Sequence, residues 1–205
     1  MKKILPLVLT ILTSTYGTTA SADNSWYLGA LYNAQQVSDL DRDFNSAGII
    51  AGYEYNAYFA LETRLTKGTS GYSSSYSVER QDSSIIFSED GYYKEDIDFQ
   101  ASLLIKASYP IFDTLNIYAL AGYSTTKLAT SGFYQQYDSN GNKMGNGSYG
   151  DTINNNGVSY GIGLSYQLIE KMSIFVDYQV LPDYELYTNF SKSWESVSIG
   201  VNYSF

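Results

Sequence analysis

An alternation of apolar and polar residues from Ile97 to Tyr109 is the feature that most constrains the fold of this chain. Ile97 and every second residue after it are apolar or aromatic, and most residues between them are polar. A period of two places the two sets on opposite faces of a β-strand, one of which meets an apolar medium. The same period closes the chain, from Val197 to Phe205. The sequence therefore predicts strands with one apolar face, which meets either a protein core or lipid.

Eight such segments follow one another, with no convincing helix between them. They are residues 26–32, 47–55, 59–67, 97–109, 115–126, 157–167, 173–180 and 197–205. Short turns follow the second, fourth and sixth, whereas longer polar connections follow the others, the longest at residues 68–95 and 127–156. Antiparallel strands with short turns at one end and long loops at the other describe a bacterial outer-membrane barrel. Only a closed sheet leaves no unpaired amides in lipid.

The aromatic residues on the apolar faces form two groups by height. The group near the short turns is Trp26, Tyr53, Tyr55, Tyr109, Tyr166, Tyr203 and Phe205, and the group toward the long loops is Tyr32, Phe99, Tyr123, Tyr160 and Tyr178. Paired aromatic girdles match the two interfaces of a membrane. A soluble sandwich or a lipocalin-like barrel is the alternative, but it has no reason to arrange its aromatic residues in this way.

The first 22 residues have the features of a signal peptide. Lys2 and Lys3 precede an apolar run from Ile4 to Leu12, and small residues follow at 20–22. The run is about half of the roughly 20 residues that a membrane-spanning helix requires. We expect residues 1–22 to be a signal peptide and residues 23–205 to form one barrel domain in the outer membrane of a Gram-negative bacterium.

Composition argues against several functions. Lys2 and Lys3 are the only charged residues before position 23, so the rest of the chain has 10 basic and 21 acidic residues, a net charge of −11. Such an acidic surface repels nucleic acid. The chain has no His, which removes the commonest general base and metal ligand and makes a Ser-His-acid triad impossible. No motif supports a Ser-Lys arrangement, and we expect neither an enzyme nor a cofactor.

The segment from Asp138 to Asn142 begins like a calcium-binding loop. The sixth position is Lys143 where such loops require Gly, and the twelfth is Tyr149 where they require Glu. The dipeptide Asn140-Gly141 instead predicts the turn of a hairpin that extends beyond the membrane.

Several short motifs resemble those of a known family. They are Tyr27-Leu28-Gly29-Ala30, Gly52-Tyr53-Glu54-Tyr55, Phe59-Ala60-Leu61-Glu62, Ala121-Gly122-Tyr123 and Gly161-Ile162-Gly163. They are similar to motifs of the small eight-stranded outer-membrane barrels, which include the OmpA transmembrane domain and the OmpX/Ail-type proteins. The resemblance implies an all-β fold, a closed eight-stranded antiparallel up-and-down transmembrane β-barrel with short periplasmic turns and long extracellular loops.

The last eight residues resemble the C-terminal signal of that family. The signal has a polar residue, a Gly and two aromatic residues, matched here by Ser198, Gly200, Tyr203 and Phe205. The resemblance implies that the barrel-insertion machinery recognises this strand.

The inward face of the predicted barrel carries six charged residues. They are Glu54, Glu62, Arg64, Asp98, Lys106 and Asp177. Because an eight-stranded barrel is only wide enough for its side chains to fill it, these charges predict a buried ionic plug. The expected function is non-enzymatic, either membrane-structural or an interaction with host or cell-surface ligands through the loops. A narrow channel for ions or small solutes is the alternative. We expect a monomer that contacts outer-membrane lipid and lipopolysaccharide.

Overall fold

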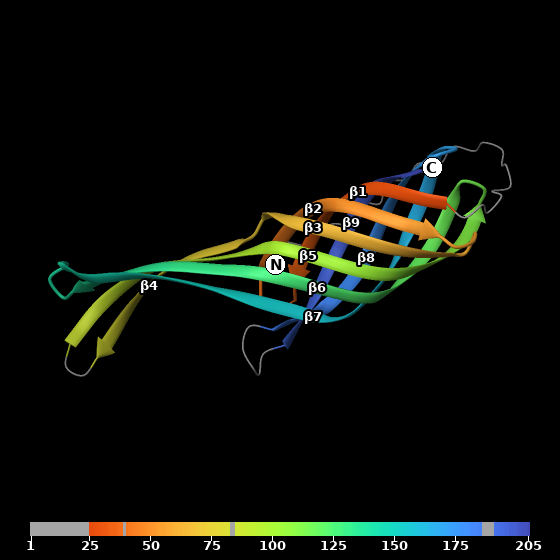
Figure 1. The fold of residues 1–205 in the computed structure, drawn as a ribbon. Helices are drawn as coiled ribbons and strands as arrows, with labels where there is room; N and C mark the ends of the chain where they lie inside the picture. The colour runs from red at the N-terminus through yellow and green to blue at the C-terminus, as the bar shows by residue number, and fades with distance from the viewer. Residues whose placement is uncertain (1–24, 39, 83–84, 186–190) are drawn as a thin grey trace.

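The computed structural model describes residues 25–38, 40–82, 85–185 and 191–205, and the predicted signal peptide lies outside them. Nine β-strands make up nearly all of the described chain (Figure 1). They are β1 (Ser25–Val37), β2 (Arg42–Glu54), β3 (Phe59–Ser70), β4 (Tyr72–Asp82), β5 (Ile85–Phe112), β6 (Leu115–Asp138), β7 (Lys143–Ile169), β8 (Met172–Glu185) and β9 (Ser191–Ser204).

Eight of these strands close into an antiparallel ring, which confirms the predicted barrel. Strands that follow one another in the sequence pair, except that β3 pairs with β5 in place of β4, and β9 pairs with β1 to close the ring. β4 continues the path of β3 beyond Gly71 and pairs with β5 alone. Closure matters physically because a strand edge in lipid would leave its amide groups without hydrogen-bond partners.

The two faces of the barrel wall differ as the alternation predicts. Leu103 points outward and is 54% exposed, whereas its neighbour Leu104 points into the barrel and is fully buried. The exposed outer face carries a belt of large apolar side chains that includes Leu28, Ile49, Leu61, Ile105, Tyr123, Val158, Ile162, Val176 and Ile199. Such a belt matches the lipid-facing surface of a transmembrane barrel.

The barrel interior contains two apolar clusters, one toward each end. Tyr27, Leu31, Ile50, Ala60, Leu104, Tyr118, Leu120 and Phe175 form the cluster toward the short turns. Val37, Phe44, Ile97, Leu128, Leu181, Tyr184 and Trp194 form the other, at the end of the long loops, and we call it the mouth cluster. Buried polar and charged residues lie between them, so the interior is layered along the barrel axis.

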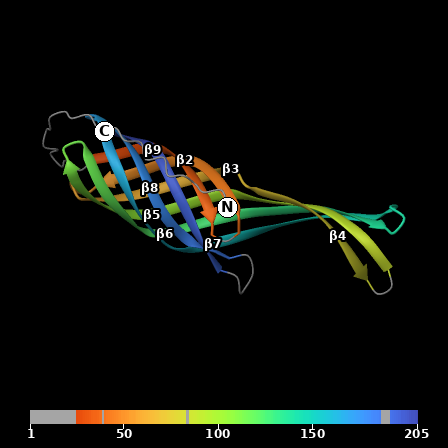
Figure 2. The same cartoon turned by 180° about the vertical axis from the view of Figure 1, so that it is seen from behind.

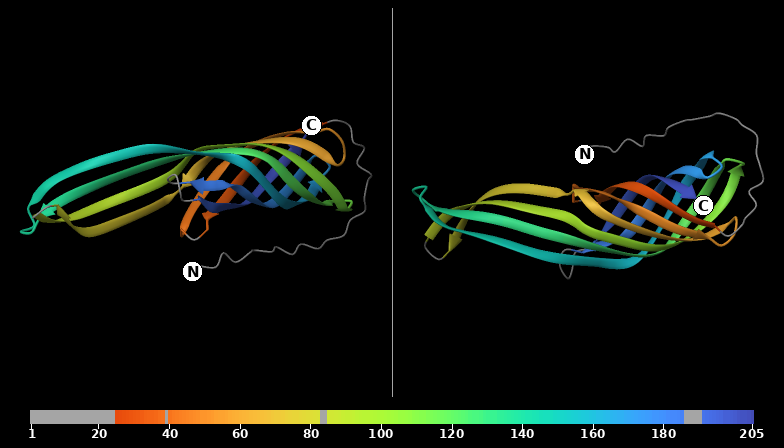
Figure 3. Two further views of the ribbon diagram at one scale, coloured as in Figure 1. Left: turned by 90° about the horizontal axis from the view of Figure 1, so that it is seen from below. Right: turned by 45° about the horizontal axis from the view of Figure 1, so that its top comes forward.

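Most described residues of the segment 68–95, predicted as a long loop, instead form strands, and that part of the prediction is wrong, whereas the hairpin predicted around Asn140-Gly141 is present. β4, the start of β5, the end of β6 and the start of β7 continue the barrel wall outward as a curved four-stranded ribbon (Figures 1, 2 and 3). We call this ribbon the projecting sheet. Its sequence has low hydropathy, but Tyr favours strands, and cross-strand pairing runs through it with one irregularity, between Gln136 and Tyr137. The predicted turn at Asn140-Gly141 is present, and Gly141 has the positive φ that it requires.

Tyrosines packed on glycines explain how this single layer of strands holds together. A Cβ built on Gly91 would lie 2.2 Å from the ring of Tyr76, and one built on Gly132 would lie 2.2 Å from the ring of Tyr149. The rings therefore lie flat across the neighbouring strand. They supply the cross-strand contact that a second layer provides in ordinary sheets.

Within the described residues there is no helix long and apolar enough to span a membrane. Those residues also contain no group of three or more His, Cys, Asp or Glu side chains arranged to hold a metal ion.

Candidate functional site

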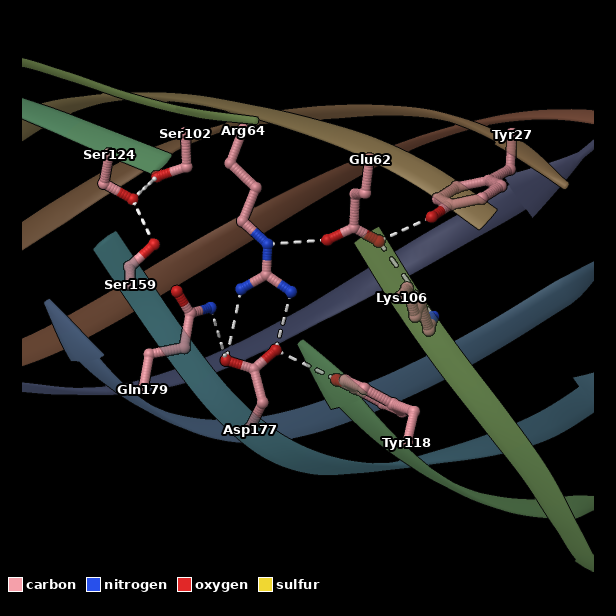
Figure 4. A network of polar contacts seen from close by, with 10 residues as sticks. All are labelled: Tyr27, Glu62, Arg64, Ser102, Lys106, Tyr118, Ser124, Ser159, Asp177 and Gln179. Atoms are coloured by element: carbon pink, nitrogen blue, oxygen red, sulfur yellow. Dashed lines mark hydrogen bonds and ion pairs between the residues drawn. The ribbon is translucent and has the colours of Figure 1, made fainter. Parts of the chain in front are cut away.

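An ion cluster crosses the interior of the barrel (Figure 4). The guanidinium of Arg64 on β3 donates from Nη1 and Nη2 to the two carboxylate oxygens of Asp177 on β8, at 3.1 and 2.7 Å. Its Nε donates to Glu62 Oε1 at 2.7 Å. In the ring, three strands separate β3 from β8 on either side. The pair thus spans the full width of the barrel, and the two-point geometry fixes the guanidinium in place.

Two tyrosines and a glutamine complete the hydrogen bonds of the carboxylates. Tyr27 donates its hydroxyl to Glu62 Oε2 at 2.5 Å, and Tyr118 donates to Asp177 Oδ2 at 2.9 Å. Gln179 Nε2 donates to Asp177 Oδ1 at 3.1 Å. Buried charges are tolerated when they are paired and hydrogen-bonded in this way. These three residues were not among those predicted from the sequence, although their position on the inward face of each strand was a signal that could have identified them.

Lys106 is held more loosely than Arg64. Its Nζ lies 4.0 Å from Glu62 Oε2 and 4.4 Å from the ring centre of Tyr118, and its side chain is 12% exposed. The ammonium is therefore stabilised by an aromatic face and by one distant carboxylate. With Glu62, Arg64 and Asp177 it makes a cluster of two anions and two cations.

Two of the six charged residues predicted for the interior lie elsewhere. Glu54 is exposed at the end of β2 beside the short turns, where Ser25 donates to it at 2.9 Å. Asp98 is on the outer surface, where its carboxylate pairs with Lys127 at 3.1 Å, so its assignment to the interior was wrong. The cause is an irregularity between Ile97 and Phe99 that adds one residue to β5. On one side of such a bulge, each residue points to the face opposite the one that strict alternation predicts. Ile97, predicted to face lipid, is therefore buried inside the barrel.

A polar layer lies between the ion cluster and the mouth cluster. Ser124 exchanges hydrogen bonds with Ser102 and Ser159 at 2.7 and 2.6 Å, and Gln100 bonds Gln35, Thr66 and Thr126. A cavity of about 10 Å³ in this layer has room for about one water. In this layer the Ser and Thr hydroxyls form hydrogen bonds with one another or with neutral side-chain amides. Among these hydrogen bonds of the described residues, none joins a hydroxyl to a basic side chain that could activate it as a nucleophile.

The C-terminal strand shows why its signal residues are suited to the wall. Ser198 is buried inside, whereas Tyr203 and Phe205 face outward with ring centres 5.4 Å apart. A Cβ on Gly200 would lie 2.4 Å from the carbonyl oxygen of Ala30 and 2.5 Å from the ring of Phe175, so only glycine fits there without a shift. The amide of Phe205 donates to the carbonyl of Trp26, which joins the two ends of the described chain.

Comparison with protein families agrees with this architecture. The model of the outer membrane protein beta-barrel domain matches residues 5–205. The chain belongs to this family. The protein is accordingly an outer-membrane β-barrel, which confirms the predicted location, and the family is generally not enzymatic.

Solved structures share the fold of this outer-membrane barrel at low sequence identity. The N-terminal β-barrel domain of Pseudomonas aeruginosa OprF is 14% identical with a TM-score of 0.50, over 90% of this chain and 100% of that one. Ail, the attachment invasion locus protein of Yersinia pestis, is also 14% identical, with a TM-score of 0.46 over 89% of this chain and 97% of its own. Ail has also been solved with the heparin analogue sucrose octasulfate. No curated protein matches the chain.

Proposed function

We propose that this outer-membrane barrel is a non-enzymatic surface-interaction protein that uses the projecting sheet as its contact element. The observation that carries the proposal is that four strands continue beyond the lipid-facing belt as one ordered ribbon (Figure 3). Elements that a rigid barrel holds in this position are where binding function concentrates.

The chemistry of the sheet suits a polypeptide or a neutral partner. Its two hairpins, residues 72–96 and 127–155, contain eight acidic and four basic residues, so like charge disfavours polyanions. Tyr92 and Phe133 are partners in register on the outer face and are each about two-fifths exposed. On β7, the residues before Tyr160 pair with β6 and with no other described strand, which leaves backbone groups for an added strand.

Removing the sheet tests this proposal without touching the barrel. Ser74, Tyr93, Gly132 and Tyr149 lie at one level, so residues 75–92 and 133–148 can each be replaced by Asn-Gly turns at matched height. We expect the trimmed barrel to keep its heat-dependent gel migration, and cells that express it to lose adhesion without envelope stress. Full adhesion with the trimmed barrel would overturn the proposal, and envelope stress with unchanged adhesion would favour a membrane-structural role.

A narrow channel is the second candidate function, favoured by the polar layer and the ion cluster inside the barrel. The width-spanning pair between Arg64 and Asp177 argues for a closed lumen in the resting protein. We expect little or no steady conductance from the folded protein in planar bilayers. Large, stable channels would contradict the closed lumen and make the channel the primary function.

The surface of the barrel wall also indicates which molecules the barrel contacts. The apolar belt supports contact with outer-membrane lipid and lipopolysaccharide by a monomer, and the C-terminal strand supports recognition by the insertion machinery. We expect deletion of Phe205 to reduce the assembled barrel more than deletion of Ser139 in the outer hairpin turn. Equal membrane yield from the two deletions would show that Phe205 is part of the barrel wall and has no role in recognition by the insertion machinery.

A further inference from the structure

The mouth cluster fills the extracellular end of the barrel. Its members come from β1, β2, β5, β6, β8 and β9, so they converge from around the ring. Trp194 is fully buried, and its ring centre lies 5.7 Å from that of Phe44 and 5.8 Å from that of Tyr184. Packed aromatic rings at such distances exclude water from the section of the barrel that they occupy.

A second ion pair fastens this cluster. Arg42 Nη1 donates to Glu95 Oε1 at 2.9 Å, and the Glu95 side chain is fully buried. Tyr184, a member of the mouth cluster, donates its hydroxyl to Glu95 Oε2 at 2.8 Å and accepts a hydrogen bond from Arg42. We call Arg42, Glu95 and Tyr184 the latch.

The latch also joins the mouth to the base of the projecting sheet. The guanidinium carbon of Arg42 lies over the rings of both Tyr72 and Tyr184, 5.2 and 5.3 Å from their centres. Tyr93, two residues before Glu95 on β5, donates to Glu95 Oε1 at 2.5 Å. Tyr72 begins β4 and is in register with Glu95, so Glu95 itself belongs to the base of the sheet, and two further sheet residues, Tyr72 and Tyr93, contact the latch.

The latch shares no residue with the ion cluster of Arg64. The polar layer separates them, and its cavity is lined by Arg64 on one side and by Leu181 of the mouth cluster on the other. Asn33 Oδ1, which lines this cavity, has no hydrogen-bond partner among the described residues, as expected of a polar atom that faces water.

From this arrangement we infer that the lumen has a closure of its own at the extracellular mouth, independent of the ion cluster and of the apolar cluster toward the short turns: an aromatic lid that the latch holds shut and ties to the projecting sheet. The polar layer between the lid and the ion cluster is an enclosed, hydrated chamber. A shift of the sheet at Tyr72 or Tyr93 breaks contacts of the latch, so the sheet controls the lid and has no direct contact with the ion cluster.

Tryptophan fluorescence tests the lid by itself. The chain has two Trp residues, and Trp26 faces outward, so Trp26→Phe leaves Trp194 as a single reporter inside the lid. In this background, iodide should barely quench the folded protein in vesicles. Replacing both charges of the latch, Arg42→Ala with Glu95→Gln, should raise the quenching constant several-fold.

The matched control removes a cation at nearly the same height on the outer surface. Lys127 pairs with Asp98 outside the barrel and precedes Leu128 of the mouth cluster. Lys127→Ala should leave the quenching constant unchanged. Equal quenching with and without the latch, or an equal rise in the Lys127 variant, would overturn the proposal. If the latch variant loses its heat-dependent gel migration, Phe44→Ala replaces it, with the same expected rise.

Quenching also tests whether the lid is independent of the ion cluster. Arg64→Ala with Asp177→Asn removes the width-spanning pair and leaves Glu62 beside Lys106. In the single-Trp background this variant should leave the iodide quenching constant of Trp194 unchanged, because the latch and the lid are intact. A rise equal to that of the latch variant would overturn the inference.

Discussion

The barrel wall and the projecting sheet are made by the same strands in different surroundings. β5, β6 and β7 each run from the membrane region into the ribbon outside, and antiparallel pairing continues across the bulge at Ile97 and Phe99. In the wall, one face meets a packed interior and the other meets lipid. In the ribbon, flat tyrosine rings over glycines take the place of a second layer. The comparison shows that the same antiparallel backbone pairing can be stabilised by two kinds of side-chain packing. The two regions should therefore tolerate substitutions to different degrees.

The largest expected difference concerns ion pairs of similar length in the two regions. Arg64 to Asp177 measures 2.7 Å in the buried interior, and Lys94 to Asp96 measures 2.5 Å on the exposed ribbon. Arg64→Ala leaves buried carboxylates without a partner and should lower the free energy of unfolding by about 3 to 5 kcal/mol. Lys94→Ala should have no measurable effect, because water screens that pair.

Denaturant unfolding in lipid vesicles, followed by gel migration, measures both ion-pair variants. Arg64→Ala with Asp177→Asn serves as the control, because removing both partners should restore part of the loss. Equal destabilisation by the Arg64 and Lys94 variants would contradict the contrast between the two regions.

The next largest difference concerns the outer face. Leu103 lies on the lipid-facing side of β5, and Tyr92 lies on the same side of that strand in the ribbon. Leu103→Arg puts a cation into hydrocarbon and should cost roughly 2 to 4 kcal/mol if the position is near the midplane. Tyr92→Arg should be tolerated because its side chain stays in water. The yield of heat-shifted protein after refolding measures both, and a Tyr92 variant that fails to assemble would mean that the ribbon is not outside the membrane.

A smaller difference is expected where tyrosine lies on glycine. A Cβ on Gly52 would lie 2.0 Å from the ring of Tyr27, and one on Gly132 would lie 2.2 Å from that of Tyr149. Gly52→Val should cost about 1 to 3 kcal/mol through overpacking, because Tyr27 is buried and bonded to Glu62. Gly132→Val should cost less, because Tyr149 is 45% exposed and can turn into water. Unfolding midpoints of the two variants would show whether this order holds.

The smallest effect is local to the outer turn. Hydrogen bonds from the Asn142 side chain and from the amides of Asn142 and Asn140 lower the pKa of Asp138. Because the pKa is lower in the folded turn, the turn is stabilised above the ordinary pKa of Asp and loses that support as the pH falls through the lowered value. The protection factor of the Asn142 amide, which is its intrinsic exchange rate divided by the observed rate and so is corrected for the intrinsic pH dependence, should fall in acid while protection factors in the barrel stay unchanged. A protection factor at Asn142 that does not change with pH would contradict this.

The ribbon also marks where sequence reasoning failed. Tyr72, Tyr76 and their Ser neighbours have too little hydropathy to resemble a membrane strand, so that region was predicted as a loop. The strands of the ribbon depend on contacts between tyrosine rings and glycines on neighbouring strands, and these contacts form only when the strands pair in the observed register. The latch was missed for the same reason, since Arg42 and Glu95 lie on different strands and join only at the mouth.

The sequence by itself determined the eight membrane strands, the outward side of residues such as Leu103, and the closed ring, because a period of two is a local property and lipid tolerates no open edge. It placed Glu62, Arg64, Lys106 and Asp177 on inward faces. Only the tertiary structure decided that Arg64 reaches Asp177 across the barrel and that the bulge in β5 turns Asp98 outward and Ile97 inward. Those outcomes depend on the stagger of neighbouring strands and on one extra residue, and neither is encoded in the alternation of any single strand.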